Sequence, residues 1–370
     1  MSELISREFV EYANPVKVIQ GAASILRLQS LVDKKGGILI VTSTGSRRRG
    51  LINKIVEMLG EDKVMIYDQV KSNPTIDDID DATEVFKSSG VEQIIALGGG
   101  SVIDTAKILA LTIPCSFSRP IGNIFYKRTK IKWQKKIPLI CVSTTSGTGS
   151  EVTPFATVWD NRENKKYSIS GDEVYPDYAI LDPELTLSLN HNNTLYPALD
   201  AISHALESLW NKNRSPCSNA FAIHSLALAV EAVPIIIKQP ENIDMRAQMQ
   251  QASLLAGYAI SQTRTAIAHS ISYPLTSHFG VPHGLACSFT LRDLLRGNLE
   301  NIAKHSHEKL VLLNVLKLLE SIDIAKMVRE FASIKEICDL TSEMKSKNRY
   351  GNFNGLLTID FEGLIVSSLG

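Results

Sequence analysis

Two residues able to bind a metal ion lie four positions apart in an apolar stretch, ALDAISHALES (residues 198–208). They are Asp200 and His204. Residues at positions i and i+4 share one face of a helix, so both side chains point in the same direction. Carboxylate and imidazole together are ligands that divalent transition metals favour. The stretch therefore predicts half of a metal site on the buried face of a helix.

Further ligands are available in a histidine-rich stretch, AIAHSISYPLTSHFGVPHGLA (266–286), which supplies His269, His278 and His283. A lone buried histidine is usually a hydrogen-bonded core residue, but a cluster together with an Asp and His on one helix face favours metal binding. One carboxylate and three imidazoles leave a coordination position for a substrate oxygen, as Lewis-acid catalysis requires. Spacing alone does not say which two of the three late histidines bind.

Two turns rich in glycine and hydroxyl groups follow apolar runs in the first half: GGGSVIDTAK (98–107) and STTSGTGSEVT (143–153). Glycine lets the backbone approach an anion, and a helix N-terminus offers N–H groups and a positive dipole end. The first turn alone could be an ordinary strand–helix connection. Two such turns at the carboxyl ends of neighbouring parallel strands form the crevice in which dinucleotides bind. The G-x-G-x-x-G fingerprint is absent, so a Rossmann-like fold is expected.

The cofactor preference depends on the residues after the apolar run GGILIVT (36–42). In NAD-preferring sites an acid near this strand end binds the ribose 2′-hydroxyl and would repel a 2′-phosphate. Here Ser43 occupies that place and the arginines 47–49 follow it. The arginines could bind a phosphate or form a solvated basic surface. We therefore expect NADP(H) to be preferred, or accepted beside NAD(H).

Residues 1–183 alternate short apolar runs with amphipathic segments, which predicts βαβ units and a parallel sheet covered by helices on both faces. The predicted strands are 36–42, 63–68, 92–100 and 138–144, and the predicted helices include 50–59 and 76–88. Beyond residue 182 the strand signal disappears and apolar residues follow helical spacing. The helical segments are 193–210, 218–237, 245–262 and 307–320. The prediction is an α/β dinucleotide-binding domain (1–183) followed by an all-helical metal-binding and substrate domain (184–370).

Composition narrows the possible classes of protein. The chain has 370 residues, with 39 Lys+Arg and 39 Asp+Glu, and so lacks the basic excess of a nucleic-acid-binding protein. No signal peptide is recognisable, and the longest apolar window (226–237) is interrupted by Glu231 and Pro234, too short for a bilayer. Five cysteines lie far apart without a C-x-x-C pair, as expected in a reducing cytosol. We expect a cytoplasmic protein without a nucleic-acid or membrane partner.

Five motifs together resemble the iron-containing (group III) alcohol dehydrogenases, in the family's order and over nearly the whole chain. They are GGGSVIDTAK, STTSGTGSEVTPFAT, LDPELT, ALDAISHALES and HSISYPLTSHFGVPHG. The resemblance implies the two-domain dehydroquinate synthase-like architecture, a small aldehyde or alcohol as substrate, and a homodimer. It implies Fe²⁺, with Zn²⁺ as the other option, on Asp200, His204, His269 and His283. It implies dinucleotide contacts from Asn73, Gly99, Gly100, Ser101, Asp104, Thr144, Thr145, Thr148, Lys166 and Leu181, beside Ser43.

The chain departs from the family at Tyr273, because many members carry a histidine there that is available for proton relay. A tyrosine hydroxyl can donate a proton but is a poor base at neutral pH. We therefore assign Tyr273 a catalytic role. The sequence does not determine the path by which the proton reaches the substrate.

Within the family, residues 263–287 most resemble phosphonoacetaldehyde reductases, which form 2-hydroxyethylphosphonate. Arg264 would then clamp an anionic substrate tail, since guanidinium binds phosphonate oxygens in pairs; a structural salt bridge is the alternative. On a continuous helix Arg264 would lie about 140° around the axis from His269, so the clamp requires a break in the helix or a side chain that curls back.

The predicted activity is hydride transfer between a nicotinamide and a small aldehyde or alcohol. Two other functions are compatible with parts of this pattern. An enzyme resembling glycerol dehydrogenase or dehydroquinate synthase would share the architecture, but the Asp-x-x-x-His helix and the two histidines fourteen positions apart favour an alcohol dehydrogenase. A non-catalytic dinucleotide-binding protein would be expected to lack a ligand or a glycine loop, and all are present.

Overall fold

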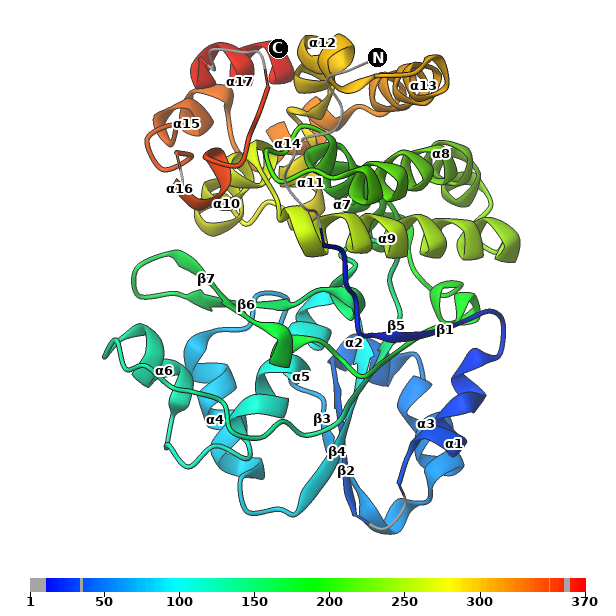
Figure 1. Ribbon diagram of the computed structural model, residues 1–370, viewed down its shortest axis with the longest axis vertical. Helices are drawn as coiled ribbons and strands as arrows, with labels where there is room; N and C mark the ends of the chain where they lie inside the picture. The colour runs from blue at the N-terminus through cyan, green and yellow to red at the C-terminus, as the bar shows by residue number, and fades with distance from the viewer. Residues whose placement is uncertain (1–10, 34–35, 346, 356–359) are drawn as a thin grey trace.

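The computed structural model describes residues 11–33, 36–345, 347–355 and 360–370 (Figure 1). The strand-containing part of the chain lies below the helical part in this view. The last strand, β8 (Tyr178–Leu181), is followed by a short 3₁₀ turn (Pro183–Thr186) and then by helix α7 (His191–Leu209). The predicted order, an α/β half followed by a helical half, is confirmed. The boundary between 183 and 184 stays a prediction.

The α/β half is built on a sheet of six parallel strands in the order β1-β8-β5-β4-β2-β3. The strands not yet named are β1 (Lys17–Gln20), β2 (Gly37–Thr42), β3 (Val64–Tyr67), β4 (Val91–Gly98) and β5 (Leu139–Ser143). The sequence predicted β2 to β5. It missed β1 and β8, which have four residues each and pair with each other.

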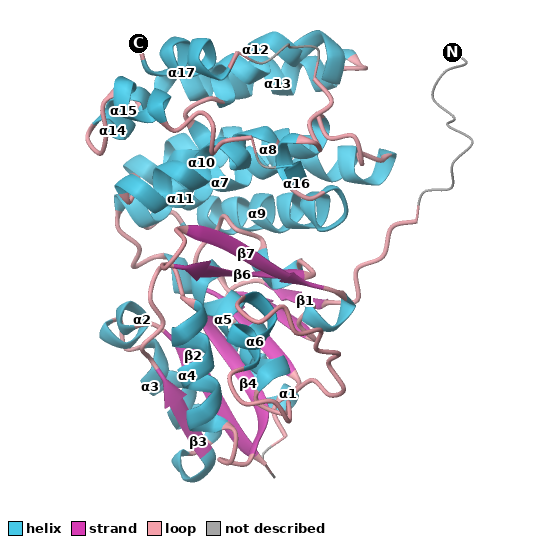
Figure 2. Ribbon diagram, turned by 90° about the vertical axis from the view of Figure 1, so that its left-hand side faces the viewer, coloured by secondary structure: helices cyan, strands magenta, loops and turns pink. Residues whose placement is uncertain are grey.

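Alternation along each strand supplies both faces of the sheet with apolar side chains, because successive residues point to opposite sides. In β2, Leu39 and Val41 pack with helices α4 (Ile76–Phe86), α5 (Gly100–Thr112) and α6 (Pro120–Phe125). Ile38 and Ile40 pack on the other side with α1 (Leu28–Leu31) and α3 (Leu51–Leu59). Figure 2 shows the resulting layers. A short helix, α2 (Thr44–Arg48), follows β2 directly.

An antiparallel hairpin, β6 (Phe155–Asp160) and β7 (Lys165–Ser170), was not predicted from the sequence. It lies between the parallel sheet and the helical half (Figure 2). Its turn contacts helix α10 (Ile267–Phe279), where the hydroxyl of Ser277 donates to the carbonyl of Asn164 at 3.2 Å. The hairpin is therefore placed to bring its side chains to the junction of the two halves.

The helical half is organised around α7, α8 (Pro216–Lys238) and α9 (Ile243–Thr263), which pack together over an aliphatic core. After them come α10, α11 (His283–Ser288), α12 (Leu291–Ile302), α13 (Ser306–Ser321), α14 (Ile324–Arg329), α15 (Ile334–Asp339), α16 (Lys347–Tyr350) and α17 (Phe361–Leu369). Leu199, Leu226 and Leu285 are fully buried in this core. Helix α7, which carries the predicted metal ligands, is thus fixed on several sides.

Helix α8 corrects one expectation. Its 23 residues make it long and apolar enough, by length and composition alone, to cross a membrane, whereas the sequence suggested too short a window. Glu231 and Pro234 do not end the helix. One face of α8, with Leu226, Ala229 and Val233, is fully buried in the helical core. That packing accounts for the apolar residues on this face, and 39% of the apolar window is buried.

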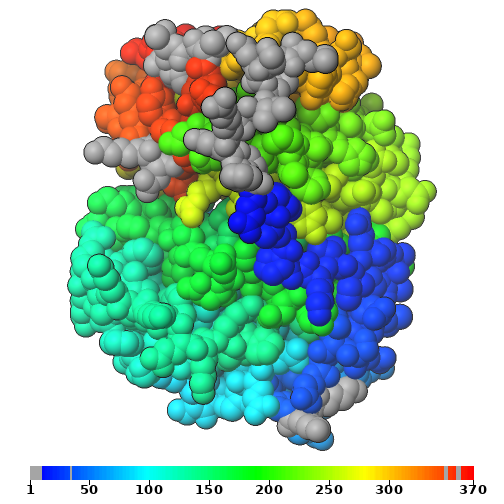
Figure 3. Space-filling model, viewed as in Figure 1, coloured from blue at the N-terminus to red at the C-terminus, as the bar shows by residue number. Residues whose placement is uncertain are grey.

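The segment that precedes β1 connects the two halves. The ring of Tyr12 packs against Phe221 of α8 at a centroid distance of 5.3 Å, and the amide of Asn14 donates to the Val152 carbonyl at 2.8 Å. In the space-filling view these blue residues cross from the upper to the lower part of the molecule (Figure 3). The segment therefore helps to fix the relative position of the halves.

Candidate active site

A cavity of about 640 Å³ lies between the two halves. Its walls are the loops at the carboxyl ends of the parallel strands, the β6–β7 hairpin, and residues of α7, α10 and α11. Such a crevice at the carboxyl edge of a parallel sheet is where α/β proteins bind ligands. The residues predicted to bind the dinucleotide and those predicted to bind the metal therefore line the same cavity.

All the predicted cofactor residues line this cavity except Leu181. Those that line it are Ser43, Asn73, Gly99, Gly100, Ser101, Asp104, Thr144, Thr145, Thr148 and Lys166. The side chain of Leu181 is fully buried with Val16 and Val152. Only its backbone is therefore available to a cofactor, and the Leu181 contact stays a prediction.

The two glycine-containing loops touch, and glycine is what allows it. A β-carbon added at Gly99 would lie 2.9 Å from the hydroxyl of Thr145, and one added at Gly100 would lie 2.6 Å from the methyl of Thr148. Within the described residues no side chain caps the N-terminus of α5. That end of α5 is therefore left for an anion, as in known phosphate sites.

Two charged side chains of α5, Lys107 and Asp104, tie the second loop and the start of β6 to this helix. The ammonium of Lys107 donates to the carbonyls of Thr153 and Phe155, each at 2.9 Å, and burial lowers its pKa. Asp104 accepts from the backbone N–H of Thr157 at 2.8 Å and from the hydroxyl of Ser150. Asp104 lines the cavity and its carboxylate also holds the loop in place; its predicted contact with a dinucleotide stays a prediction.

The residues after β2 have divided roles. Ser43 caps α2 by accepting from the backbone N–H of Ser46 at 3.5 Å. Arg49 lines the cavity and donates to the hydroxyls of Thr144 and Ser188, each at 3.3 Å. Arg47 instead forms an ion pair with Asp68 at the surface. Only Arg49 of the three arginines therefore lies where a cofactor group could reach it.

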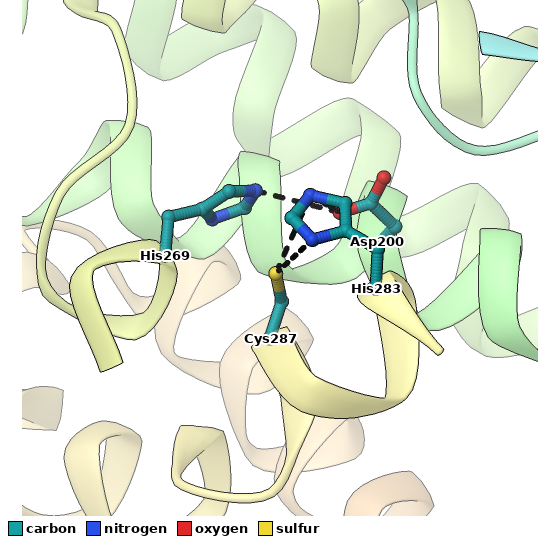
Figure 4. Close-up of side chains that lie close together, drawn as sticks. All are labelled: Asp200, His269, His283 and Cys287. Atoms are coloured by element: carbon teal, nitrogen blue, oxygen red, sulfur yellow. Dashed lines mark hydrogen bonds and ion pairs between the residues drawn. The ribbon is translucent and has the colours of Figure 1, made fainter. Parts of the chain in front are cut away.

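Four side chains with metal-binding atoms converge at the helical end of the cavity. Asp200 Oδ1 lies 3.5 Å from Nε2 of both His204 and His269, and 4.0 Å from Nε2 of His283. Figure 4 shows Asp200, His269 and His283 approaching one another from different helices. Within the described residues, Asp200 Oδ1 is buried and has no partner in hydrogen-bonding geometry. Burying a carboxylate oxygen without a partner costs free energy unless a cation binds to it.

The spacing of these donors fits one metal ion. A tetrahedron with bonds of about 2.1 Å has edges of about 3.4 Å. The Nε2 atoms of His204 and His269 are 3.1 Å apart and each lies 3.5 Å from Asp200 Oδ1, close to this edge length, whereas Nε2 of His283 is farther from Asp200 Oδ1, at 4.0 Å. Imidazole and carboxylate suit iron and zinc alike. The residues present therefore fit a divalent transition metal.

The pKa shifts of Asp200, His204 and His283 favour metal binding, whereas that of His269 opposes it. Burial lowers the pKa of His204 to about 4, and burial together with the Lys166 ammonium lowers the pKa of His283 well below its ordinary value. Burial opposes ionisation of Asp200, but the surrounding imidazoles outweigh it and lower the pKa of this carboxyl. Neutral imidazoles and an ionised carboxylate are the forms that bind metal.

His269 has a partner that the sequence analysis missed. Glu207 is fully buried on α7 and accepts from both the backbone N–H of His269, at 3.1 Å, and the ring Nδ1. Burial opposes protonation of His269, but Cys287 and Glu207 raise its pKa. A carboxylate on the far nitrogen of a ligand histidine fixes its orientation. Glu207 follows Asp200 by seven positions, so helical periodicity could have revealed it.

Cys287 is a second residue that was missed. It lies one turn after His283, with its sulfur 3.6 Å from Nδ1 and 3.7 Å from Nε2 of that ring. Its sulfur belongs to a group of ligand atoms with Asp200, His269 and His283 that all lie within 4.8 Å of one another. Burial raises the pKa of the thiol, and the thiolate is the form that binds metal. Cys287 is therefore better described as a neighbour of the site than as a ligand.

Glycine also lets α11 lie against α7. A β-carbon added to Gly284 would overlap the carbonyl of Tyr196 and lie 3.2 Å from the β-carbon of Asp200. The absence of a side chain at Gly284 brings the preceding His283 to Asp200. The sequence pair His-Gly is thus a local requirement of the site.

The remaining predicted residues separate clearly. Tyr273 lines the cavity, with its ring stacked on that of His283 at 6.0 Å. His278 lies away from the cluster, paired with Glu343 at 2.9 Å. Helix α9 ends at Thr263, so the break needed near Arg264 is present, but Arg264 is exposed and does not line the cavity. The structure therefore gives no support to Arg264 as a substrate clamp.

Comparison with known proteins agrees with this arrangement. The family profile described as iron-containing alcohol dehydrogenase matches residues 15–183, and its C-terminal counterpart matches 194–355. The long-chain primary alcohol dehydrogenase of Thermoanaerobacter ethanolicus is 30% identical over 310 residues, 79% of this chain and 77% of that protein. The sulfoacetaldehyde reductase of Bilophila wadsworthia is 31% identical over 285 residues, 76% of this chain and 72% of that protein.

Solved structures show the same relationship. A sulfoacetaldehyde reductase from Bifidobacterium kashiwanohense, in complex with NAD⁺, superposes with a TM-score of 0.85 and 25% identity over 98% of both chains. An iron-containing alcohol dehydrogenase from Thermotoga maritima gives a TM-score of 0.79 and 26% identity, over 97% of this chain and 98% of that one. The chain is therefore an oxidoreductase that belongs to the family of iron-containing alcohol dehydrogenases.

Proposed function

We propose that this protein is an iron-dependent, nicotinamide-linked reductase of small aldehydes. The observation that carries the proposal is that one carboxylate and three imidazoles line the same cavity as two loops rich in glycine and hydroxyl groups. The family and the NAD⁺ complex of the Bifidobacterium structure support iron and NAD(H) as cofactors. Zn²⁺ and NADP(H) are further options that the same residues could accommodate.

Each group has a defined task in this proposal. Asp200, His204, His269 and His283 hold the metal, which when bound polarises a carbonyl group and so favours hydride attack at its carbon. The end of α5 and the loop 143–153 hold the cofactor phosphates. The hydroxyl of Tyr273 is available beside His283 as a proton donor to the nascent alcohol.

The proposal is tested with purified protein loaded with Fe²⁺ or Zn²⁺ and given NADH or NADPH with a panel of aldehydes. We expect metal-dependent oxidation of the reduced cofactor, abolished by a chelator and restored by Fe²⁺. Bound metal and bound cofactor without turnover of any aldehyde would contradict the proposal.

Cofactor choice gives a second expected result. No acid occupies the position of Ser43, so NADPH should be used beside NADH, and Ser43→Asp should shift kcat/KM toward NADH by repelling the 2′-phosphate. Because the new charge lies near a solvent-open cavity, a shift of about five- to fiftyfold is expected, corresponding to roughly 1–2 kcal/mol. Steady-state kinetics with both cofactors measure it. A wild-type enzyme that uses NADH alone would show that Ser43 does not set the preference.

The proposed substrate is phosphonoacetaldehyde, on the basis of the resemblance of residues 263–287, and the anionic aldehyde named for two relatives is a chemical parallel. Arg264 does not line the cavity, so the anionic tail would need another partner in this chain. A cytoplasmic location and a homodimer remain predictions.

A further inference from the structure

Two cationic side chains meet over one aromatic ring at the metal end of the cavity. The ammonium of Lys166 lies 4.2 Å from the ring centroid of Tyr273, and the guanidinium carbon of Arg349 lies 4.3 Å from the same centroid. Lys166 comes from β7, and Arg349 comes from α16, far along the chain. All three line the cavity and are partly exposed to it.

The positive charges of Lys166 and Arg349 are held in place but are not paired with an acidic side chain. Among the described residues, neither Lys166 nor Arg349 has an ion pair or a side-chain hydrogen bond; Lys166 also lies 5.4 Å from the ring centroid of Trp159. The acids that line the cavity are Asp104, which is engaged by the loop, and Asp200, which belongs to the histidine cluster. An aromatic face attracts a cation by about 0.5–1 kcal/mol but does not cancel its charge. The two cations therefore still repel each other, and an anion between them would relieve that repulsion.

The position of the pair identifies which ligand the anion belongs to. The ring of Tyr273 lies 6.0 Å from that of His283 and 6.4 Å from that of His269. A group bound by Lys166 and Arg349 is thus next to the reacting end of the cavity, whereas the glycine loops and α5 face the cofactor phosphates. A short molecule can therefore place a carbonyl at the histidine cluster and an anion at the two cations.

Both cations are carried by elements attached to α10, the helix of Tyr273. The hairpin of Lys166 is bound to it through Ser277 and Asn164 at 3.2 Å. The segment that contains Arg349 is attached to α10 by Ser270, which donates to the Met344 carbonyl, and to the residues just before α10 by Asn352, which donates to the Thr265 carbonyl at 3.0 Å. The backbone elements that carry the cations are therefore fixed relative to α10, and the Tyr273 ring holds both side chains, which reduces the cost of ordering them on binding.

We propose that Lys166, Arg349 and Tyr273 form a subsite for an anionic substituent of the substrate, so that the enzyme selects short aldehydes carrying a phosphonate, sulfonate or carboxylate. The inference rests on the proposed aldehyde reductase function and assigns its substrate class. It reassigns Lys166, predicted from the sequence as a dinucleotide contact, to the substrate. Guanidinium offers paired donors to such oxygens and ammonium adds a point charge. Tyr273 positions the two cations in addition to its proposed part in proton transfer.

The experiment compares Arg349→Met and Lys166→Met with the matched control Arg264→Met, a change at an exposed arginine outside the cavity. Each protein is assayed with phosphonoacetaldehyde, sulfoacetaldehyde and butanal. The ratio of kcat/KM for either anionic aldehyde to that for butanal should fall by about ten- to a hundredfold in the two test variants. The Arg264→Met ratio should equal that of the wild type. The two anionic aldehydes separate a phosphonate from a sulfonate preference.

A second measurement separates the subsite from the catalytic proposal. Binding of ethylphosphonate and ethanesulfonate to the cofactor-loaded protein is followed by calorimetry, with NADH affinity and thermal unfolding measured for every variant. Weaker binding of these anions with retained NADH affinity supports the subsite even if no aldehyde turns over. Equal losses on anionic and neutral aldehydes, or a loss confined to NADH affinity, would overturn it and assign the cations to the fold or to the cofactor.

Discussion

Replacement of His269 or His283 by alanine is expected to remove bound iron and to lower aldehyde reduction by more than about a thousandfold, since a metal Lewis acid supplies several kcal/mol of charge stabilisation. The dinucleotide should still bind, because the loops around Gly99 and Thr145 lie in the other half of the molecule. Metal content of the purified variants and fluorescence titration with NADH measure the two effects separately.

His278→Ala is the matched control for both changes. His278 lies in the same helix as His269 but pairs with Glu343 at 2.9 Å, away from the cluster. It should keep its metal and most of its activity. Loss of metal in this variant with retention of metal in His283→Ala would mean that the ligand assignment is wrong.

The architecture was largely predictable because two periodicities dominate the sequence. The apolar runs of β2 to β5 and the helical spacing of α7 to α9 each bury their side chains as the pattern requires. Strands β1 and β8 have only four residues, too few for alternation to stand out. Strand β7, with the sequence KKYSIS, carries charged and hydroxyl side chains and pairs with β6, which faces the cavity. Because β7 is so polar, its sequence did not indicate a buried strand.

In the site, too, residues that are close in sequence could be predicted, whereas residues brought together by packing could not. Asp200 and His204 were identifiable because both lie on one face of α7. Arg264 looked suitable by closeness in sequence to His269, but α9 ends just before it and its side chain is exposed. Arg349 reaches the cavity from a four-residue helix near the end of the chain, which no spacing rule connects to α10. Contacts that depend on such long-range packing are not encoded in local pattern.

Glu207 illustrates the intermediate case. It belongs to the same stretch as Asp200 and lies almost two turns further along α7, so its direction toward the site followed from periodicity. The partner of Glu207 could not be predicted in this way, because His269 belongs to α10 and meets Glu207 only after α7 and α10 pack. The carboxylate uses both oxygens on one residue, the backbone N–H and the ring Nδ1 of His269. This double contact fixes the helix position and the ring together.

Glu207→Gln should therefore weaken the metal site although Glu207 is not a ligand. A glutamine side chain has one oxygen and one NH₂ group, and so can accept from only one of the two donors. In either orientation of the amide, its NH₂ group faces an N–H of His269 in a fully buried environment. An unsatisfied buried donor costs about 1–3 kcal/mol. Loss of an outer carboxylate on a ligand histidine typically lowers metal affinity by about ten- to a hundredfold.

Competition with a chelator of known affinity measures that change, and thermal unfolding of the metal-free protein measures the loss of stability separately. Glu343→Gln is the matched control, because Glu343 also contacts a histidine, His278, but at the surface and outside the cavity. It should leave metal affinity unchanged. If both variants bound metal as tightly as the wild type, Glu207 would serve only to join α7 to α10, and the orientation of His269 would have to come from its packing against His204, whose ring stacks on it at 4.8 Å.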